Sequence, residues 1–501
     1  MTAAGVTPGA QARIVPPFYP IVYVRGYAMT SGERDETFQD AYYGFSANSV
    51  ERRNAAPGAG YVAVDIFEGQ LIRFMKAHGY VDACHGGLAL ACERGTADPS
   101  RSIWISRFYD RDVLTGTLRS IVEHAEDLRA LVCEAIPSQL REAGVIPAEN
   151  DAGYKVILVA HSMGGLVCRT LIQNVLPARR IDPTTVVHRL VTLGTPHGGI
   201  TLDAVPHLVQ SVATGTLNMF DAGMFLPERM VEYLKLPPDA KPTSLGDSFP
   251  PTRCLCVIGS DHASYGAVRF ATGGYSDGLV KQNNAYVDGA YYANVHRAHS
   301  GQRGIVNSYE SFENIRRFLF GNIKVAIALD DVRVGTQVEP GYDCFYDVEF
   351  VLSVRGTGVY LHRREEDPCE NAIRRSRKEL DGQSVLLHVG FMNSNLKRDV
   401  SDDFSHFLMK LRVVERRVKH GLLWDHEYPD RVIFNEMLEV GVGDHDRDQP
   451  GDSLKYRWLS DSTDGDFQPA AAANGSFRIP LRPAAAFAGR LRITPAAWDG
   501  D

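Results

Sequence analysis

A serine placed directly between a buried strand and a helix constrains this chain more than any other feature of its sequence. Residues 156–160, VILVA, form an apolar run that is typical of a strand covered on both faces. Ser162 follows this run, and over 163–176 apolar residues recur with the spacing of a helix. So direct a turn from strand to helix predicts an exposed hydroxyl at the edge of a sheet, beside the amide groups of a helix N-terminus.

The residues two positions before and after this serine are both small. They are Ala160 and Gly164, and a turn this tight needs small residues there because larger ones would collide with neighbouring strands. The usual pattern for such a nucleophile is G-x-S-x-G, from which Ala160 departs by one methyl group. The alternative interpretation is a serine that only caps the following helix.

The first 321 residues alternate apolar runs with amphipathic stretches. Such alternation predicts an α/β domain, in which helices cover both faces of a mostly parallel sheet. The expected strands are 21–24, 103–105, 156–160, 190–193, 254–258 and 290–295, and the expected helices are 67–78, 121–143, 163–176 and 309–320.

After Gly321 the character of the chain changes, because short strand-like segments follow one another with few helices between them. The expected strands are 324–334, 345–354, 384–390, 407–413, 454–458, 476–481 and 490–494. This pattern predicts an antiparallel β-sandwich. We therefore expect an α/β domain over 1–321 and a β-sandwich domain over 322–501, with at best a short helix at 371–378 and loops at the alanine-rich 470–473 and 484–486.

Four segments of the first domain together resemble the lipase branch of the α/β-hydrolase superfamily. In chain order they are PIVYVRGY at 20–27, AHSMGG at 160–165, LGTPHGG at 193–199, and SDGLV at 276–280 followed by His299. Their order is similar to the family order of oxyanion loop, nucleophile, acid and base. The resemblance implies a serine esterase with Ser162 as nucleophile, which acts through a Ser-His-Asp triad and an acyl-enzyme intermediate. It does not extend to residues 322–501.

Two histidines compete for the role of the general base. Both His296 and His299 follow the expected strand 290–295, after which this fold carries its base. His296 abuts the strand, whereas His299 lies in a loop from which its ring can swing over the serine. Geometry therefore favours His299.

The acid that orients the base also has two candidates. Asp277 lies in a short polar turn 22 residues before His299, a spacing similar to that in the resembling lipases. Asp261 follows the strand 254–258 directly, where many other α/β-hydrolases carry their acid. The spacing favours Asp277, although Asp-Gly is also a common turn pair.

Backbone amides are expected to form the oxyanion hole. Met163, the residue after the nucleophile, would supply one amide, and the resemblance implies that Tyr27 supplies the other. Arg25 stands where the family usually has a histidine. His161 and His197 lie within the resembling segments, and we expect them to support the site rather than to transfer protons, since a buried, hydrogen-bonded histidine is the commoner case.

Composition and charge exclude several kinds of partner. The chain has 61 acidic and 53 basic residues and a net charge of −8, so it lacks the basic excess that nucleic-acid binding requires. The sequence contains no run of 18 apolar residues, so it predicts no membrane-spanning helix. The N-terminus lacks the basic cluster and apolar run of a secretory signal, so we expect a cytoplasmic location.

Neither a cofactor nor a metal ion is expected. The 8 cysteines include no CxxC pair, and the sequence favours free thiols in a reducing compartment over a disulfide framework or a zinc site. The acidic segment 444–448 begins like a calcium loop but departs from that pattern at Gln449 and Lys455, which favours a solvated turn.

A long insertion over 200–250 precedes the strand 254–258. Its clustered Met and Phe residues fit either a cap packed on the core or a lid over the serine. The expected substrate is an acyl ester or a lipid, and contact with a lipid surface would be compatible with it. The alternatives are an acyltransferase or thioesterase with the same triad, and a catalytically silent binding protein. The hypothesis of a catalytically silent protein predicts that the triad is damaged, whereas this sequence keeps all three residue types in order.

Overall fold

The structure is a computed structural model that describes most of the chain. The described residues are 14–26, 45, 51–55, 62–66, 69–83, 98–108, 119–147, 153–200, 222–264, 274–301, 303–335, 342–355, 357–396, 402–419, 426–427, 430–443, 453–460 and 466–498. The chain divides into two compact units. The first comprises Met1–Tyr291 and Arg297–Phe312, and the second comprises Tyr292–His296 and Glu313–Gly500.

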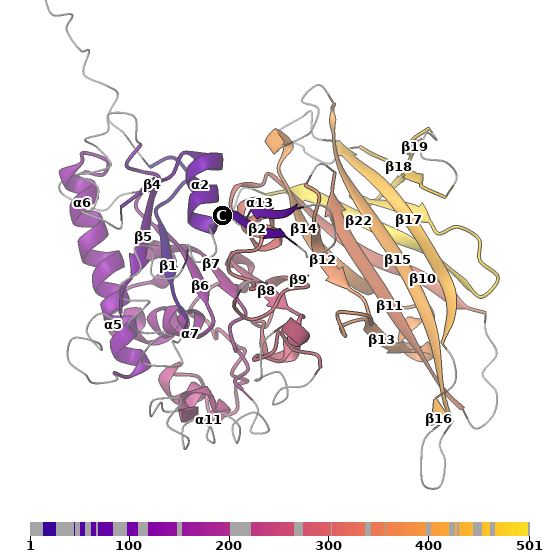
Figure 1. Cartoon of the computed structure of the whole chain (residues 1–501), viewed down its shortest axis with the longest axis horizontal. Coiled ribbons are helices and arrows are strands. Elements are labelled where there is room, and N and C mark those ends of the chain that lie inside the picture. The colour runs from indigo at the N-terminus through magenta and orange to yellow at the C-terminus, as the bar shows by residue number, and fades with distance from the viewer. Residues whose placement is uncertain are drawn as a thin grey trace, which may run out of the picture. The chain divides into compact units, whose positions relative to one another are not determined.

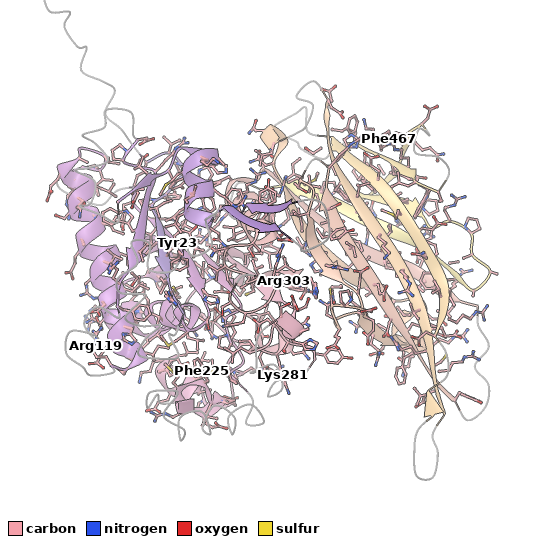
Figure 2. All side chains as sticks on the ribbon, in the orientation of Figure 1. Tyr23, Arg119, Phe225, Lys281, Arg303 and Phe467 are labelled. Atoms are coloured by element: carbon pink, nitrogen blue, oxygen red, sulfur yellow. The ribbon has the colours of Figure 1, made fainter. Side chains whose placement is uncertain are left out.

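A seven-stranded sheet includes the strand that precedes Ser162, which is β6 in Figure 1. Its strands, in sheet order, are β4 (Val81–Asp82), β5 (Ser102–Ser106), β1 (Ile21–Val24), β6 (Val156–His161), β7 (Val187–Leu193), β8 (Cys254–Gly259) and β9 (Tyr291–Val295). Every pairing from β4 to β8 is parallel. All four residues of β1 are buried, including Tyr23 (Figure 2), as are all seven of β7, so both faces of the central sheet are covered.

Helices follow the strands of this sheet. They are α2 (Gln70–His78), α5 (Ile121–Ala130), α6 (Ile136–Glu142), α7 (Met163–Thr170), α8 (Leu176–Ala178), α9 (Pro183–Val186), α11 (Pro227–Tyr233) and α13 (Tyr309–Phe320). The π-helical turns η1 (Leu131–Ala135) and η2 (Leu171–Val175) join α5 to α6 and α7 to α8. Ser120 and Glu123 form a capping box that fixes the start of α5.

Short elements complete this part of the chain. Two strands, β2 (Glu51–Ala55) and β3 (Val62–Ile66), pair antiparallel. The single-turn 3₁₀ helices are η3 (Ala222–Phe225), η4 (Pro251–Arg253), η5 (His262–Ser264) and η6 (Gln282–Asn284). The predicted α/β fold with a mostly parallel sheet is confirmed, and each of its six expected strands is present with ends shifted by at most three residues.

The C-terminal part consists of two antiparallel sheets. One has the order β14 (Val385–Met392), β10 (Ile323–Val334), β22 (Phe487–Ala497), β21 (Ser476–Pro480) and β20 (Ala471–Ala473). The other has the order β12 (Tyr360–Arg364), β11 (Tyr342–Val354), β15 (Phe404–Lys419), β17 (Arg431–Gly443), β18 (Leu454–Trp458) and β19 (Gln468–Pro469), with β13 (Ile373–Ser376) on β11 and β16 (His426–Glu427) on β15.

One apolar core fills the space between these two sheets. Ile323, Val325, Ile327 and Leu329 alternate along β10 and are buried in the same cluster as Phe350 of the other sheet. Period-two alternation places one face of each sheet inward. The predicted β-sandwich is therefore confirmed.

Two local expectations in this part were wrong. Residues 371–378, expected as a short helix, form β13 and then the start of the one-turn helix α14 (Arg377–Leu380), because β11 offers Ile373–Ser376 a pairing edge. The alanine run at 470–473, expected as a loop, contains β20, which pairs with β21. The acidic segment 444–448 lies outside the described residues.

No helix in the described ranges is both long enough and apolar enough to cross a membrane. The domain boundary was expected near Asn322. The longer of the two segments that form the second compact unit begins earlier, at Glu313. Whether 1–321 and 322–501 fold independently stays a prediction.

Candidate active site

Ser162 lies at the point where β6 turns directly into α7. Its backbone has φ 53° and ψ −126°, in a region that residues with a Cβ rarely adopt. The Ser162 N–H donates to the Leu193 carbonyl oxygen at 2.9 Å, and the Thr195 hydroxyl donates to the Ser162 carbonyl oxygen at 2.9 Å. Bonds on both sides of the residue hold it in this strained conformation.

Small residues allow the turn to pack against its neighbours. A Cβ at Gly164 would collide with the carbonyl oxygens of Val24 and Arg25, at the end of β1. A Cβ at Gly165 would collide with the side chain of Thr195. The predicted requirement for a small residue after the serine thus has a specific cause, which is the close approach of the helix to β1.

The structure brings three of the predicted site residues together. Nε2 of His299 lies 3.0 Å from Oγ of Ser162, and Nδ1 of His299 lies 2.8 Å from Oδ2 of Asp277. All three residues are buried, with exposed fractions of 7% for Ser162, 3% for His299 and 1% for Asp277. A histidine nitrogen in reach of a serine hydroxyl, with its other nitrogen on a carboxylate, is the arrangement that activates a serine nucleophile.

Backbone groups hold the side chain of Asp277 and the main chain of His299 in place. The Asp277 Oδ1 atom accepts from the N–H groups of Leu279 and Val280 at 3.0 and 2.7 Å, while Oδ2 is left for His299. The His299 N–H donates to the Asp277 carbonyl oxygen at 2.9 Å. Asp277 and His299 are therefore joined through both main chain and side chain.

The two rival candidates lie in other environments. Asp261 follows β8, where its Oδ1 accepts from the Ser264 N–H at 3.1 Å and its own N–H donates to the Arg297 carbonyl oxygen. His296 directly follows β9, and it is His299, three residues on, whose ring contacts the serine. The geometry thus pairs Ser162 with the two residues that the sequence favoured.

The expected oxyanion-hole residues are only partly described. Met163 is the first residue of α7 and is buried, so its amide lies at the helix N-terminus beside Ser162. Tyr27 lies outside the described residues. Its neighbour Gly26 is close to the serine, since a Cβ added there would lie 2.7 Å from Cβ of Ser162.

The two supporting histidines make different contacts. Nε2 of His161 lies 3.0 Å from the His299 carbonyl oxygen, and Nε2 of His197 lies 2.9 Å from Oγ1 of Thr192. Burial is the main cause that holds the pKa of each ring well below its usual range, with nearby positive charge adding to it. Both rings are therefore neutral at ordinary pH.

Sequence reasoning missed two residues of the segment 193–199. Gly194 has φ 56°, and a Cβ there would lie 3.0 Å from Oδ2 of Asp277 and 3.2 Å from Nδ1 of His299. Thr195 holds the serine carbonyl, as described above. The segment resembles lipases in sequence, but the spacing of its residues does not predict that Gly194 lies against Asp277 and His299 or that Thr195 bonds to Ser162.

The described half of the insertion is anchored to the helix that follows the serine. Arg169 is fully buried and donates to the carbonyl oxygens of Ser244 and His197 at 2.6 and 3.3 Å. Asn174 donates to the Tyr233 carbonyl oxygen at 2.9 Å. These bonds attach Ser244 and Tyr233 to the helical segment after Ser162, whereas residues 201–221 lie outside the described part of the chain.

The fold and this geometry together define a class of protein. A strained serine on a strand-to-helix turn of a parallel sheet, followed along the chain by Asp277 and then His299, has the topology and the residue order of the α/β-hydrolase fold. The chain therefore has the architecture of the α/β-hydrolase fold.

Comparison with known proteins gives no match to a family model or a curated protein and several matches to solved structures. Among solved structures, it is similar to the Bacillus licheniformis lipase BlEst2 in its mature form, with 16% identity over 62% of this chain and 96% of that chain and a TM-score of 0.31. The phospholipase PlaB from Legionella pneumophila is 13% identical over 78% of this chain and 86% of that chain, with a TM-score of 0.32. Both similarities are too weak to add to what the fold and the site geometry indicate.

Proposed function

We propose that the protein is a serine carboxylic-ester hydrolase that acts on acyl esters and lipids. The observation that carries this proposal is the chain of contacts from Oγ of Ser162 through the ring of His299 to Oδ2 of Asp277, at 3.0 and 2.8 Å. A serine hydroxyl is a weak nucleophile unless a base in hydrogen-bond reach takes its proton. The four lipase-like sequence segments support acyl lipids, including phospholipids, as the substrate class.

In the first half of the reaction, Nε2 of His299 takes the hydroxyl proton while Oγ of Ser162 bonds to the acyl carbon. The electron pair of the ester carbonyl moves onto its oxygen, and the amide of Met163 at the start of α7 stabilises that negative charge. When the tetrahedral intermediate collapses, the alcohol leaves with the proton from His299 and the acyl group stays on Ser162.

In the second half, water replaces the alcohol. His299 takes a proton from water as the oxygen attacks the acyl-enzyme, and collapse returns that proton to Oγ of Ser162 and releases the carboxylic acid. Throughout both halves, Asp277 accepts the hydrogen bond from Nδ1–H of His299 and stabilises the imidazolium that forms. The N–H groups of Leu279 and Val280 hold the carboxylate in the orientation that this role requires.

The direct test is hydrolysis of p-nitrophenyl esters from acetate to palmitate by the wild type and by Ser162→Ala. We expect the variant to fold and to lose about 10⁴- to 10⁶-fold in turnover. Ser102→Ala is the matched control, because Ser102 is a buried serine on β5 that accepts from the Trp104 ring. A folded Ser162→Ala that keeps more than about a tenth of the wild-type rate would rule out this nucleophile. An acyl ester or amide product in place of the free acid would show acyl transfer instead of hydrolysis.

A further inference from the structure

His161 touches the loop that carries the base, although it is no member of the proposed triad. It directly precedes Ser162, and its ring lies 4.9 Å from the His299 ring, centroid to centroid. Its Nε2 atom is 3.0 Å from the main-chain carbonyl oxygen of His299. Because a carbonyl oxygen can only accept, Nε2 of His161 carries the hydrogen and donates it. This contact selects a single tautomer of the His161 ring.

The same ring is confined on its other side by Gly26. A Cβ added to Gly26 would lie 3.0 Å from Nδ1 of His161 and 2.7 Å from Cβ of Ser162. The His161 ring therefore occupies a narrow space between Gly26, which lies two residues after β1, and the loop of His299. It links the turn that bears the nucleophile to the loop that bears the base.

The charge state of His161 suits this position. Burial chiefly, and the charges of His299 and Arg25 in addition, hold the pKa of His161 well below its usual range. A neutral ring lets His299 become positively charged during the reaction without repulsion from a second imidazolium 4.9 Å away.

We propose that His161 is a positioning residue for the base, which it holds through the hydrogen bond from its Nε2–H to the His299 carbonyl oxygen. Two main-chain bonds then fix His299, since its N–H already donates to the Asp277 carbonyl oxygen. With both in place, Nε2 of His299 stays 3.0 Å from Oγ of Ser162. The proposal rests on the hydrolase function proposed above, because it assigns His161 a part in the same reaction.

Two replacements separate the hydrogen bond from the ring. His161→Gln places an amide donor near the Nε2 position, whereas His161→Phe keeps a ring and removes the donor. We expect His161→Phe to lower kcat for p-nitrophenyl butyrate, and the rate of labelling by a fluorophosphonate, about 10- to 100-fold at nearly unchanged KM. His161→Gln should stay within about threefold of wild type. His161→Met serves as a second donor-free variant if His161→Phe does not fold.

His188→Phe is the matched control. His188 is 1% exposed on β7, where its ring packs against the Tyr19 ring with 4.5 Å between the centroids, and burial lowers its pKa to about 3. We expect this variant to keep wild-type kcat. Equal losses in His161→Phe and His188→Phe, equal losses in His161→Gln and His161→Phe, or full activity of a folded donor-free variant would each overturn the positioning role. A wild type that neither hydrolyses esters nor reacts with the probe would instead overturn the proposed function.

Discussion

The backbone conformation of Ser162 is strained, and hydrogen bonds to its main chain stabilise it. A non-glycine residue with φ 53° is strained by about 1–3 kcal/mol. The Leu193 carbonyl, the Thr195 hydroxyl and the Gly165 N–H all bond to the Ser162 main chain. Strain that is held this firmly keeps Oγ in one place, which matters because a nucleophile must meet its base within hydrogen-bond distance.

Gly194 lies close to the side chains of Asp277 and His299, the proposed acid and base. A methyl group there would press on Oδ2 of Asp277 and Nδ1 of His299, and φ 56° adds strain of about 1–2 kcal/mol for any residue with a Cβ. We expect Gly194→Ala to lower kcat on a short ester by more than about tenfold, because small displacements of catalytic groups are costly. Steady-state kinetics together with thermal melting would measure both effects.

Gly79 provides the matched control for that substitution. It has φ 66° at the end of α2, and a Cβ there would meet nothing within 4 Å. Gly79→Ala should therefore lose about 1 kcal/mol of stability and keep full activity. If Gly194→Ala and Gly79→Ala had the same activity, the crowding argument would fail.

At the residue scale, sequence reasoning predicted the backbone geometry where one local pattern determines it. The turn around Ser162 is such a pattern, and chain order pointed to Asp277 and His299, which the structure brings within hydrogen-bond distance of one another. The contacts of Gly194 and His161 could not be predicted, because each depends on loops from distant parts of the chain meeting at one point.

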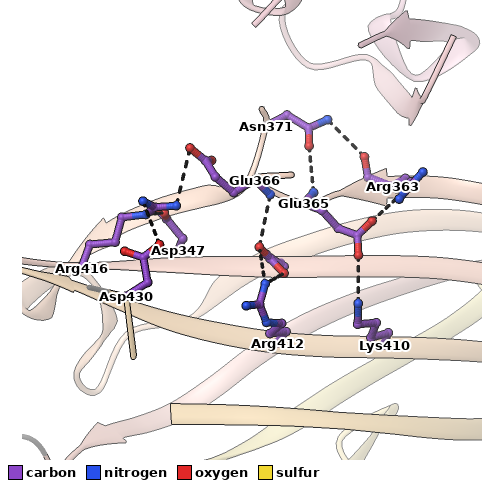
Figure 3. Close-up of polar contacts among 10 residues, drawn as sticks. Asp347, Arg363, Glu365, Glu366, Asn371, Lys410, Arg412, Arg416 and Asp430 are labelled. Atoms are coloured by element: carbon purple, nitrogen blue, oxygen red, sulfur yellow. Dashed lines mark hydrogen bonds and ion pairs between the residues drawn. The ribbon is translucent and has the colours of Figure 1, made fainter. Parts of the chain in front are cut away.

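At the scale of elements, the eight-stranded sheet carries a row of paired charges across β11 and β15 (Figure 3). Asp347 is fully buried and bonds to Arg374 at 2.8 Å and to Arg416. Glu349 lies two residues further on the same face and bonds to Arg412 at 2.9 Å. Because strands alternate their side chains, these acids lie on the face opposite the apolar core.

Asp347 should stabilise the sandwich in a pH-dependent way. Burial alone would raise the pKa of its carboxyl, but hydrogen bonds and charge from Arg374 and Arg416 outweigh burial and lower the pKa. A carboxyl whose folded pKa is lowered adds stability above its unfolded pKa of about 4 and loses it as pH falls through the folded pKa. We expect Asp347→Asn to cost about 1–3 kcal/mol at pH 7, less than a fully buried pair because both arginines are partly exposed.

Urea unfolding of wild type and Asp347→Asn at pH 7 and pH 3 would measure this cost. The difference between the two proteins should shrink at pH 3, because this pH lies below the unfolded pKa of about 4 and the unfolded chain then binds the proton that the folded carboxyl resists. Asp430→Asn is the matched control, because Asp430 pairs with the same Arg416 at 3.2 Å but is 44% exposed. It should cost less than about 1 kcal/mol. A difference that stayed constant with pH would contradict the ionic explanation.

Strand prediction in this part was least successful where partners decide the structure. The long strand β17 was not predicted at all, because the run RVIFNEMLEVGVG mixes apolar and polar residues without strict alternation. It forms because β15 and β18 pair with it on both sides, with a register shift between Val413 and Val414. Pairing of this kind depends on residues far away in sequence, which a local pattern does not contain.

At the scale of the whole molecule, the second compact unit extends beyond the sandwich strands. Within that unit, Trp498 near the C-terminus donates from its ring nitrogen to the Phe318 carbonyl oxygen of α13 at 2.9 Å and packs on Phe391. Asn294 of β9 donates its N–H to Nδ1 of His362 at 3.2 Å. The change in sequence character at Gly321 marked the first sandwich strand correctly, but it could not reveal these long-range bonds.

The proposed nucleophile, base and acid all belong to the first unit, so the central claim concerns that unit alone. Reaction of the full chain with a fluorophosphonate, followed by peptide mass spectrometry, tests it most directly, because the probe reacts with serines that a neighbouring base has activated. We predict one adduct, on Ser162, and no adduct in Ser162→Ala or in protein inactivated by unfolding. An adduct on any other serine, or ester hydrolysis that persists while Ser162 stays unlabelled, would contradict the account.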